Sequence, residues 1–195
     1  KTSKLAKFNP LASLGKIYVD IIRGTPLLVQ LLIMYYVVFG SYQFMPKIFV
    51  AAVAFGINSG AYIAEIIRGG IQSIDKGQME AARSLGMSKS MAMKLIIIPQ
   101  AIKIILPAVG NEFVTLIKET SVLSFVGVVE ILRKGTLLNA ATYQAFPAYI
   151  GVALAYMLLT IPLSKLIGVM ENRSKNPRQA VELIDEEPAL EGEAA

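Results

Sequence analysis

Two residue types that carry most enzymatic and metal chemistry are missing from this chain of 195 residues, which contains neither cysteine nor histidine. Without cysteine the chain forms neither a disulfide framework nor a thiolate metal site. Without histidine it lacks the commonest general base and the commonest metal ligand. Catalysis would have to rest on carboxylates, lysine or tyrosine alone, so we expect no catalytic centre and no metal site.

Charged residues are also scarce. They make up 17% of the chain, against 54% hydrophobic residues, whereas soluble domains are usually about 25% charged. The net charge is +5, but no basic stripe interleaved with aromatic residues is present, so no nucleic-acid partner is expected. The lipid bilayer is the expected surrounding of most of the chain.

Four apolar stretches approach or exceed the roughly 20 residues that a helix needs to cross a bilayer. They cover about 17–40, 48–67, 95–117 and 146–169, and the third is interrupted by Pro99 and Pro107. A single such stretch would leave a buried helix of a soluble core as an alternative. Four of them predict an all-α, polytopic membrane helical bundle.

Lysine and arginine alternate between the connecting segments. Residues 1–23 and 68–94 carry five each, and residues 165–178 carry four, whereas the link after the first stretch carries Lys47 alone. Because cytoplasmic segments are enriched in these residues, we expect the N-terminal segment, the 68–94 loop and the C-terminus to face the cytoplasm. The expected transmembrane domain covers residues 1–175. In segment 176–195, six acidic residues stand against Arg178 alone, which favours a flexible cytoplasmic tail.

The most specific stretch is the loop at about 69–94, which continues into the third apolar stretch. Good helix formers follow Gly77, and Gly86 is placed to end a helix over 78–85. Ala81, Ala82 and Leu85 should give this helix a small, flat apolar side that a partner can approach closely. The loop is therefore expected to hold a short amphipathic helix at the membrane surface.

The spacing in this loop resembles the EAA signature of permeases in ATP-binding-cassette (ABC) importers. Glu80, Ala81 and Ala82 are followed by three residues, Gly86, nine residues and the sequence IIIP, which departs from the family pattern only at Ile98. RGTPLLVQ at 23–30, the 59–70 segment and KETS at 118–121 resemble the polar amino-acid subfamily. The resemblance covers about 17–173. The family has one further span before RGTP, so we expect five spans in the full fold and a piece missing before Lys1.

The resemblance implies the permease subunit of an importer in a prokaryotic cytoplasmic (inner) membrane, carrying a polar or basic L-amino acid inward by alternating access. The coupling helix, with Glu80, Ala81, Ala82, Leu85 and Gly86, would dock on a cytoplasmic ATPase dimer. No G-x-x-x-x-G-K-[ST] motif occurs, so ATP and Mg would bind the ATPase chain and no cofactor this one. A second permease chain, identical or a sibling, and a solute-binding receptor are further expected partners.

Polar residues inside the apolar stretches are candidate substrate ligands, because such groups are costly in a membrane and usually face a cavity or a partner. Asn58, Tyr62 and Glu65 share one face of the second stretch. The third stretch contributes three more, and the candidates are Asn58, Tyr62, Glu65, Asn111, Glu112 and Thr115. Polar packing between helices, or pairing of the carboxylates with Lys103 or Lys118, is the alternative. Arg23 is interpreted as an arginine that extends to the membrane surface.

Two other classes of function remain as alternatives. A secondary transporter or channel would use Glu65 and Glu112 for protons or ions, but would leave the EAA-like loop without a role. An intramembrane enzyme ranks far below, because the chain lacks histidine and cysteine and no serine has an obvious paired base.

Overall fold

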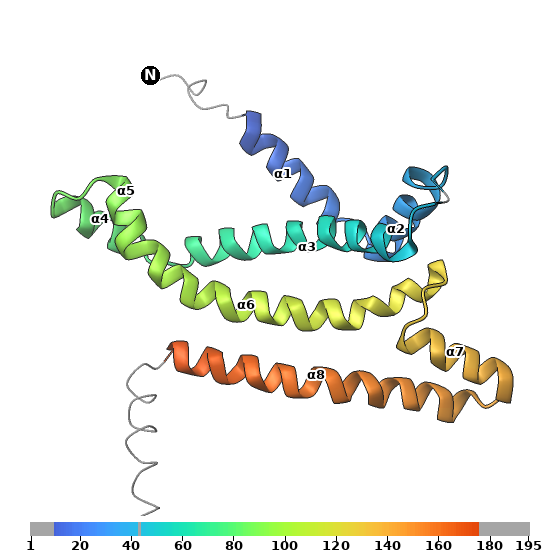
Figure 1. Cartoon of the computed structure of the whole chain (residues 1–195). Coiled ribbons are helices and arrows are strands. Elements are labelled where there is room, and N and C mark those ends of the chain that lie inside the picture. The colour runs from blue at the N-terminus through green and yellow to red at the C-terminus, as the bar shows by residue number, and fades with distance from the viewer. Residues whose placement is uncertain (1–9, 43, 176–195) are drawn as a thin grey trace, which may run out of the picture. The chain divides into compact units, whose positions relative to one another are not determined.

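The fold is a set of helices connected by short turns, seen in a computed structural model that describes residues 10–42 and 44–175 (Figure 1). Within these residues no strand occurs. The elements are α1 (Pro10–Arg23), α2 (Leu27–Leu32), the π-helical η1 (Ile33–Val38), α3 (Lys47–Gln72), α4 (Lys76–Ser84), α5 (Lys89–Ala92), the π-helical η2 (Met93–Ile97), α6 (Ile98–Glu119), the 3-10 helix η3 (Thr120–Val126), α7 (Ile131–Thr142) and α8 (Ala145–Lys175). The predicted tail lies outside the described residues.

Three continuous helical segments are long and apolar enough to cross a membrane. They are Lys47–Gln72, Lys89–Val126 and Ala145–Asn172. Each contains one of the last three predicted spans, so these spans and the all-α class are confirmed. The interruption predicted at Pro107 is wrong, because this proline lies inside the continuous helix α6. The same holds for Pro99, the second residue of α6, because α5 and η2 precede it in the continuous segment Lys89–Val126.

The first predicted span is wrong as a single continuous helix. Residues 17–40 are divided between α1 and the α2–η1 segment, which meet at an angle of 103°. Pro26 has no N–H and disfavours a helical conformation of Thr25, so α1 ends at Arg23 and a new helix begins at Leu27. We call residues 10–38 the elbow.

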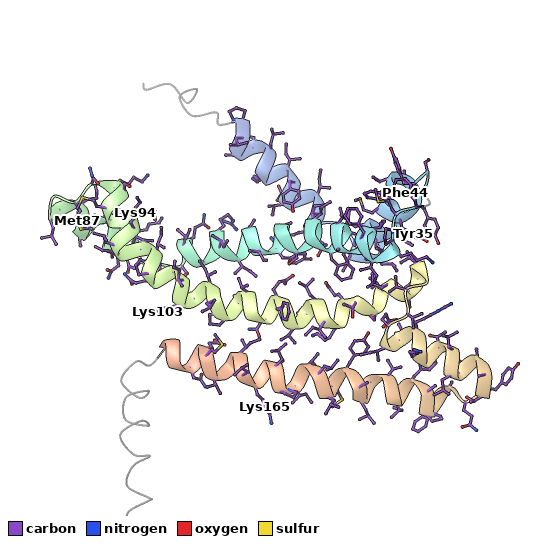
Figure 2. The ribbon with its side chains drawn as sticks, viewed as in Figure 1. Tyr35, Phe44, Met87, Lys94, Lys103 and Lys165 are labelled. Carbon is purple, nitrogen blue, oxygen red and sulfur yellow. The ribbon has the colours of Figure 1, made fainter. Side chains whose placement is uncertain are left out.

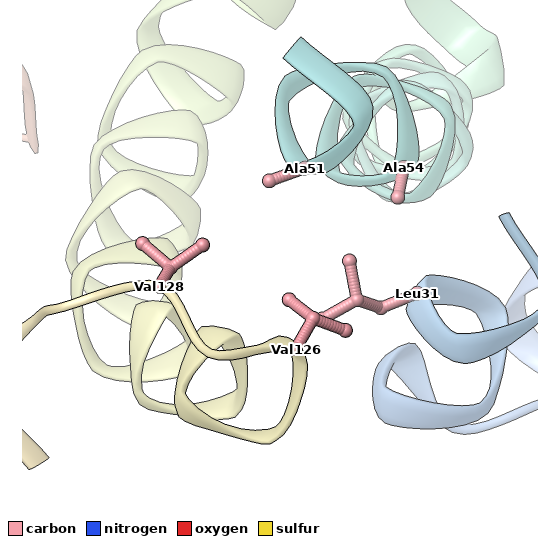
Figure 3. Close-up of a cluster of buried hydrophobic side chains, with 5 residues drawn as sticks. All are labelled: Leu31, Ala51, Ala54, Val126 and Val128. Atoms are coloured by element: carbon pink, nitrogen blue, oxygen red, sulfur yellow. The ribbon is translucent and has the colours of Figure 1, made fainter. Parts of the chain in front are cut away.

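The chain divides into two compact units, and the first consists of residues 1–66 and 115–158. Its core joins the elbow, the start of α3 and the segment after α6 through Leu31, Ala51, Ala54, Val126 and Val128 (Figure 3). Leu31 is completely buried, and the two alanines keep this face of α3 small enough for the other segments of the core to approach it closely.

Two polar contacts fix the ends of short helices in this first unit. The Lys47 ammonium donates to the carbonyl of Val126 at 3.0 Å and lies 5.7 Å from the ring of Tyr35. Glu130 accepts hydrogen bonds from the N–H groups of Leu132 and Arg133, both at 2.6 Å, and thereby caps α7. These contacts satisfy polar groups at the helix ends.

The second unit consists of residues 67–114 and 159–195. Gly70 of α3 lies against Ile105 of α6, and a side chain on Gly110 of α6 would meet Ile167 of α8 at 3.1 Å. These glycines allow the helices to approach each other closely. The α4 loop belongs to this unit, so it is attached to the ends of α3 and α6.

Candidate functional site

The start of α4 is fixed by a local cap. The carboxylate of Asp75 accepts a hydrogen bond from the N–H of Gly77 at 2.6 Å, which satisfies one of the free donors at the helix N-terminus. The helix runs from Lys76 to Ser84, so the helix predicted over 78–85 is confirmed with its bounds shifted by one or two residues.

The end of α4 is a Schellman motif centred on Gly86. The N–H of Met87 donates to Ala82 O and the N–H of Gly86 donates to Arg83 O, both at 3.1 Å. This geometry needs a left-handed residue, and Gly86 has φ +82°. A Cβ at Gly86 would meet no atom within 4 Å. Glycine is therefore required here by backbone conformation and not by lack of space.

The exposed side of α4 differs from the predicted one at a single residue. Glu80 and Ala81 are exposed and Leu85 is 84% exposed, as docking on a partner requires. Ala82 is 1% exposed. Ala82 is thus buried within the protein, where α4 packs against η2 and α5, and its role in coupling stays a prediction. Figure 2 labels Met87 and Lys94 in this part of the chain.

The polar face predicted on α3 exists, and its first member has a partner within the protein. Asn58 is 2% exposed and donates from its amide nitrogen to Gln30 Oε1 at 2.9 Å. Interhelical polar packing, the alternative interpretation, thus accounts for this hydrogen bond of Asn58.

The other two members of this face meet Arg23 of the elbow. A guanidinium nitrogen of Arg23 lies 3.4 Å from Glu65 Oε1, and the guanidinium carbon lies 5.4 Å from the centre of the Tyr62 ring. Arg23 therefore has specific partners that its interpretation as a surface arginine did not include. The pair also reduces the negative potential expected from Glu65.

Gln30 is a structural residue of this region that the sequence analysis did not single out. Its side-chain nitrogen donates to Ile22 O at 2.7 Å, to Thr25 O at 3.1 Å and to Thr25 Oγ1 at 2.8 Å. These are groups exposed by the break between α1 and α2. The signal was present in the sequence as a lone amide within the apolar run LLVQLL.

The remaining candidate ligands are divided between the units. Asn111 is exposed and Glu112 half-buried, and both belong to the second unit, whereas the half-buried Thr115 belongs to the first with Asn58, Tyr62 and Glu65. A substrate site built from all six stays a prediction. An apolar pocket of about 240 Å³ in the first unit is lined by elbow residues with Ala54 and Ile57. None of the six candidates lines it.

No group of three or more histidine, cysteine, aspartate or glutamate side chains that could hold a metal ion occurs among the described residues. The arrangement consists of apolar membrane-spanning helices and a capped, exposed helix in the loop between two of them. These features define a polytopic membrane protein with a short helix available to a partner.

Comparison with known proteins identifies the family. The chain belongs to the family described as binding-protein-dependent transport system inner membrane component, whose model matches residues 5–176. It is 43% identical over 170 residues to the probable glutamine ABC transporter permease protein GlnM of Bacillus subtilis, covering 87% of this chain and 79% of that protein. It is 38% identical over 177 residues to the arginine transport system permease protein ArtQ of the same organism, covering 89% and 80%.

A solved structure gives the same result. The crystal structure of an amino acid ABC transporter with histidines contains a chain that is 46% identical, with a TM-score of 0.78, covering 88% of this chain and 78% of that one. The resemblance to amino-acid ABC permeases is thus confirmed. This chain is a transport subunit and not an enzyme, and ATPase activity lies on a separate subunit.

Proposed function

We propose that this chain carries a polar or basic L-amino acid into the cytoplasm as the permease of an ABC importer driven by an ATPase dimer. The observation that carries the proposal is the α4 loop. It presents Glu80, Ala81 and Leu85 to solvent on a helix whose two ends are capped locally. A short rigid helix between two spans can pass a displacement of a bound ATPase to the membrane helices by rigid-body movement.

The assembly that we propose contains two permease chains, two ATPase chains and a solute-binding receptor. The names of the relatives and of the matched family, which refer to an ABC transporter and a binding protein, support the ATPase and the receptor. Three to four spans from one chain enclose little volume, and a two-fold pair is the commonest closed symmetry. The proposed location is the prokaryotic cytoplasmic membrane, with the α4 loop and the C-terminus inside.

The amino-acid class rests on the relatives and on the charges in the membrane. One relative is named for glutamine and another for arginine. Glu65 is paired with Arg23, and a preference for basic amino acids would depend on Glu65 and Glu112 at the proposed site. Uptake by Glu65→Gln and Glu112→Gln variants in vesicles tests this dependence. Loss of uptake of a basic amino acid in either variant supports it, and unchanged uptake in both contradicts it.

The coupling role is tested by reversing a charge on the exposed side of α4. Glu80→Lys should leave membrane insertion intact while separating ATP hydrolysis from uptake. Gly86→Asp should do the same by straining the helix end. The measurement is uptake per ATP hydrolysed in reconstituted vesicles that contain the receptor. Normal uptake in a normally expressed Glu80→Lys variant would contradict the assignment, as would transport driven by an ion gradient alone.

A further inference from the structure

A groove of about 450 Å³ lies beside α4 in the second unit, and the coupling role does not use it. Its walls are mostly apolar, and Lys76 and Asp75 also line it. The apolar lining residues are Ile71, Ile74, Met79, Met93 and Ile97. Ile97 is 5% exposed, whereas Lys76 is exposed. A groove of flexible methionines and isoleucines with a cation at its edge suits a short peptide that combines apolar and acidic side chains.

The surroundings of the groove are basic. The exposed side chains of Lys76, Arg83, Lys89 and Lys94 lie on α4, α5 and η2. Asp75 and Glu80 are the acidic residues of the loop, and Asp75 already accepts the N–H of Gly77. The loop therefore has an excess of positive charge that an acidic segment can complement.

One segment of this chain has the matching chemistry. Residues 181–187 read VELIDEE, with Val181, Leu183 and Ile184 among four carboxylates. We propose that segment 181–187 docks in the groove beside α4, with its apolar side chains against Met79 and Met93 and its carboxylates facing Lys76 and Lys89. This interaction is separate from the coupling role, since it leaves Glu80, Ala81 and Leu85 exposed to a partner.

The order of the spans brings this segment to the correct side of the membrane. The α4 loop precedes the span that contains α6, and α8 is the next span along the chain. The helix between them, α7, has 12 residues, too few for the roughly 20 that a crossing requires. The C-terminal end of α8 therefore emerges on the side that carries the α4 loop.

The connecting residues are long enough. Gly110 of α6 is level with Ile167 of α8 in the second unit. From this level α8 extends about 12 Å to Lys175, at 1.5 Å per residue. In the same direction, α6 and η2 extend about 26 Å back to Met93. The axial gap of about 14 Å and a lateral step of about 10 Å between packed helices give a distance of about 17 Å. The six residues 176–181 reach about 20 Å when extended.

Disulfide trapping tests the docking directly, because the chain contains no cysteine. Leu183→Cys is combined with Met79→Cys in the groove or, as a control, with Met91→Cys, which is exposed on α5 outside both the groove and the proposed docking side. In the full-length complex, mild oxidation should join the first pair at least about fivefold faster than the second, because docking raises the local concentration at the groove. Labelling of Met79→Cys with a maleimide in a tail-truncated chain verifies that this position is accessible.

Charge exchange provides a second, independent measurement. The charge of the groove is reversed by Lys76→Glu, and that of the segment by the double substitution Glu186→Lys and Glu187→Lys. Each change alone should slow trapping at low salt, and the combination of all three substitutions should restore the rate. High salt should reduce the effect of each variant. Equal trapping at Met79→Cys and Met91→Cys would overturn the proposal. The proposal would also be overturned if Leu183→Cys were trapped only to the ATPase chain. Absence of trapping at a Met79→Cys that the maleimide can reach would overturn it as well.

Discussion

The elbow in the first unit and the α4 loop in the second both change the direction of the chain, but they are stabilised in different ways. At the elbow, Gln30 binds carbonyl and hydroxyl oxygens that lie five and eight residues away, and Asn58 of α3 holds Gln30 in turn. At the α4 loop, Asp75 and Gly86 stabilise the helix ends through neighbours within five residues. The elbow thus depends on tertiary contacts, whereas the loop is determined locally.

This difference agrees with the composition of the two regions. A helix break in an apolar segment must satisfy the carbonyls that it exposes, since lipid offers no hydrogen-bond donors. A docking helix in water has solvent for its remaining polar groups and must keep one side free for its partner. Local caps meet both needs, because they use no residue from the rest of the protein.

The largest effect is expected from removing the amide of the elbow. Gln30→Leu keeps an apolar side chain of similar size but leaves Ile22 O, Thr25 O and Asn58 without this partner, which should destabilise the folded protein by about 2–4 kcal/mol. Thermal unfolding in detergent, followed by circular dichroism, measures this loss.

Gln100→Leu is the matched control for the elbow variant. Gln100 donates a hydrogen bond from its side-chain nitrogen to Ile96 O at 2.9 Å, within its own helical segment. We expect its replacement to cost less than about 1 kcal/mol. Equal losses in the two variants would show that the elbow is no more dependent on its amide than an ordinary helix.

A smaller effect is expected at Gly86, where conformation alone is decisive. Gly86→Ala should destabilise the end of α4 by about 1–2 kcal/mol, because φ is +82°, and Gly86→Asn should cost less. Gly69→Ala is the control, since Gly69 also has open space around a Cβ but lies within α3 without a positive φ. This control should be neutral or slightly stabilising.

Limited trypsin digestion reads the local effect at Gly86, because loosening of the loop exposes the peptide bonds after Arg83 and Lys89. Cleavage should be faster in Gly86→Ala than in the parent and unchanged in Gly69→Ala. Faster cleavage in both variants would contradict the conformational explanation.

The smallest effect on stability is expected at Leu85. Its side chain is 84% exposed, so Leu85→Ala should change the free energy of unfolding by less than about 0.5 kcal/mol. The same variant should bind the ATPase subunit more weakly, since the leucine lies on the side proposed for docking. Ala82→Leu, at a buried neighbour, should instead destabilise the loop by overpacking. Unchanged ATPase binding in Leu85→Ala would remove this residue from the docking surface.

The sequence was sufficient wherever the determining residues are close together in the chain. Long apolar runs predicted the helices α3, α6 and α8, because the bilayer requires helices of about this length. Gly86 could be placed at the end of α4 because a helix C-terminus favours glycine irrespective of the rest of the fold. The spacing of Glu80, Gly86 and Pro99 was likewise enough to indicate the family.

Only the tertiary structure decided which polar groups meet across the chain. Arg23 and Glu65 are 42 positions apart in the sequence, and no periodicity relates them, yet the bend at Pro26 and the packing of the elbow bring them within 3.4 Å. The burial of Ala82 likewise depends on η2 and α5 folding back on α4. Hydrophobicity along the chain fixes which segments enter the membrane, whereas the partner of each polar side chain depends on packing in three dimensions.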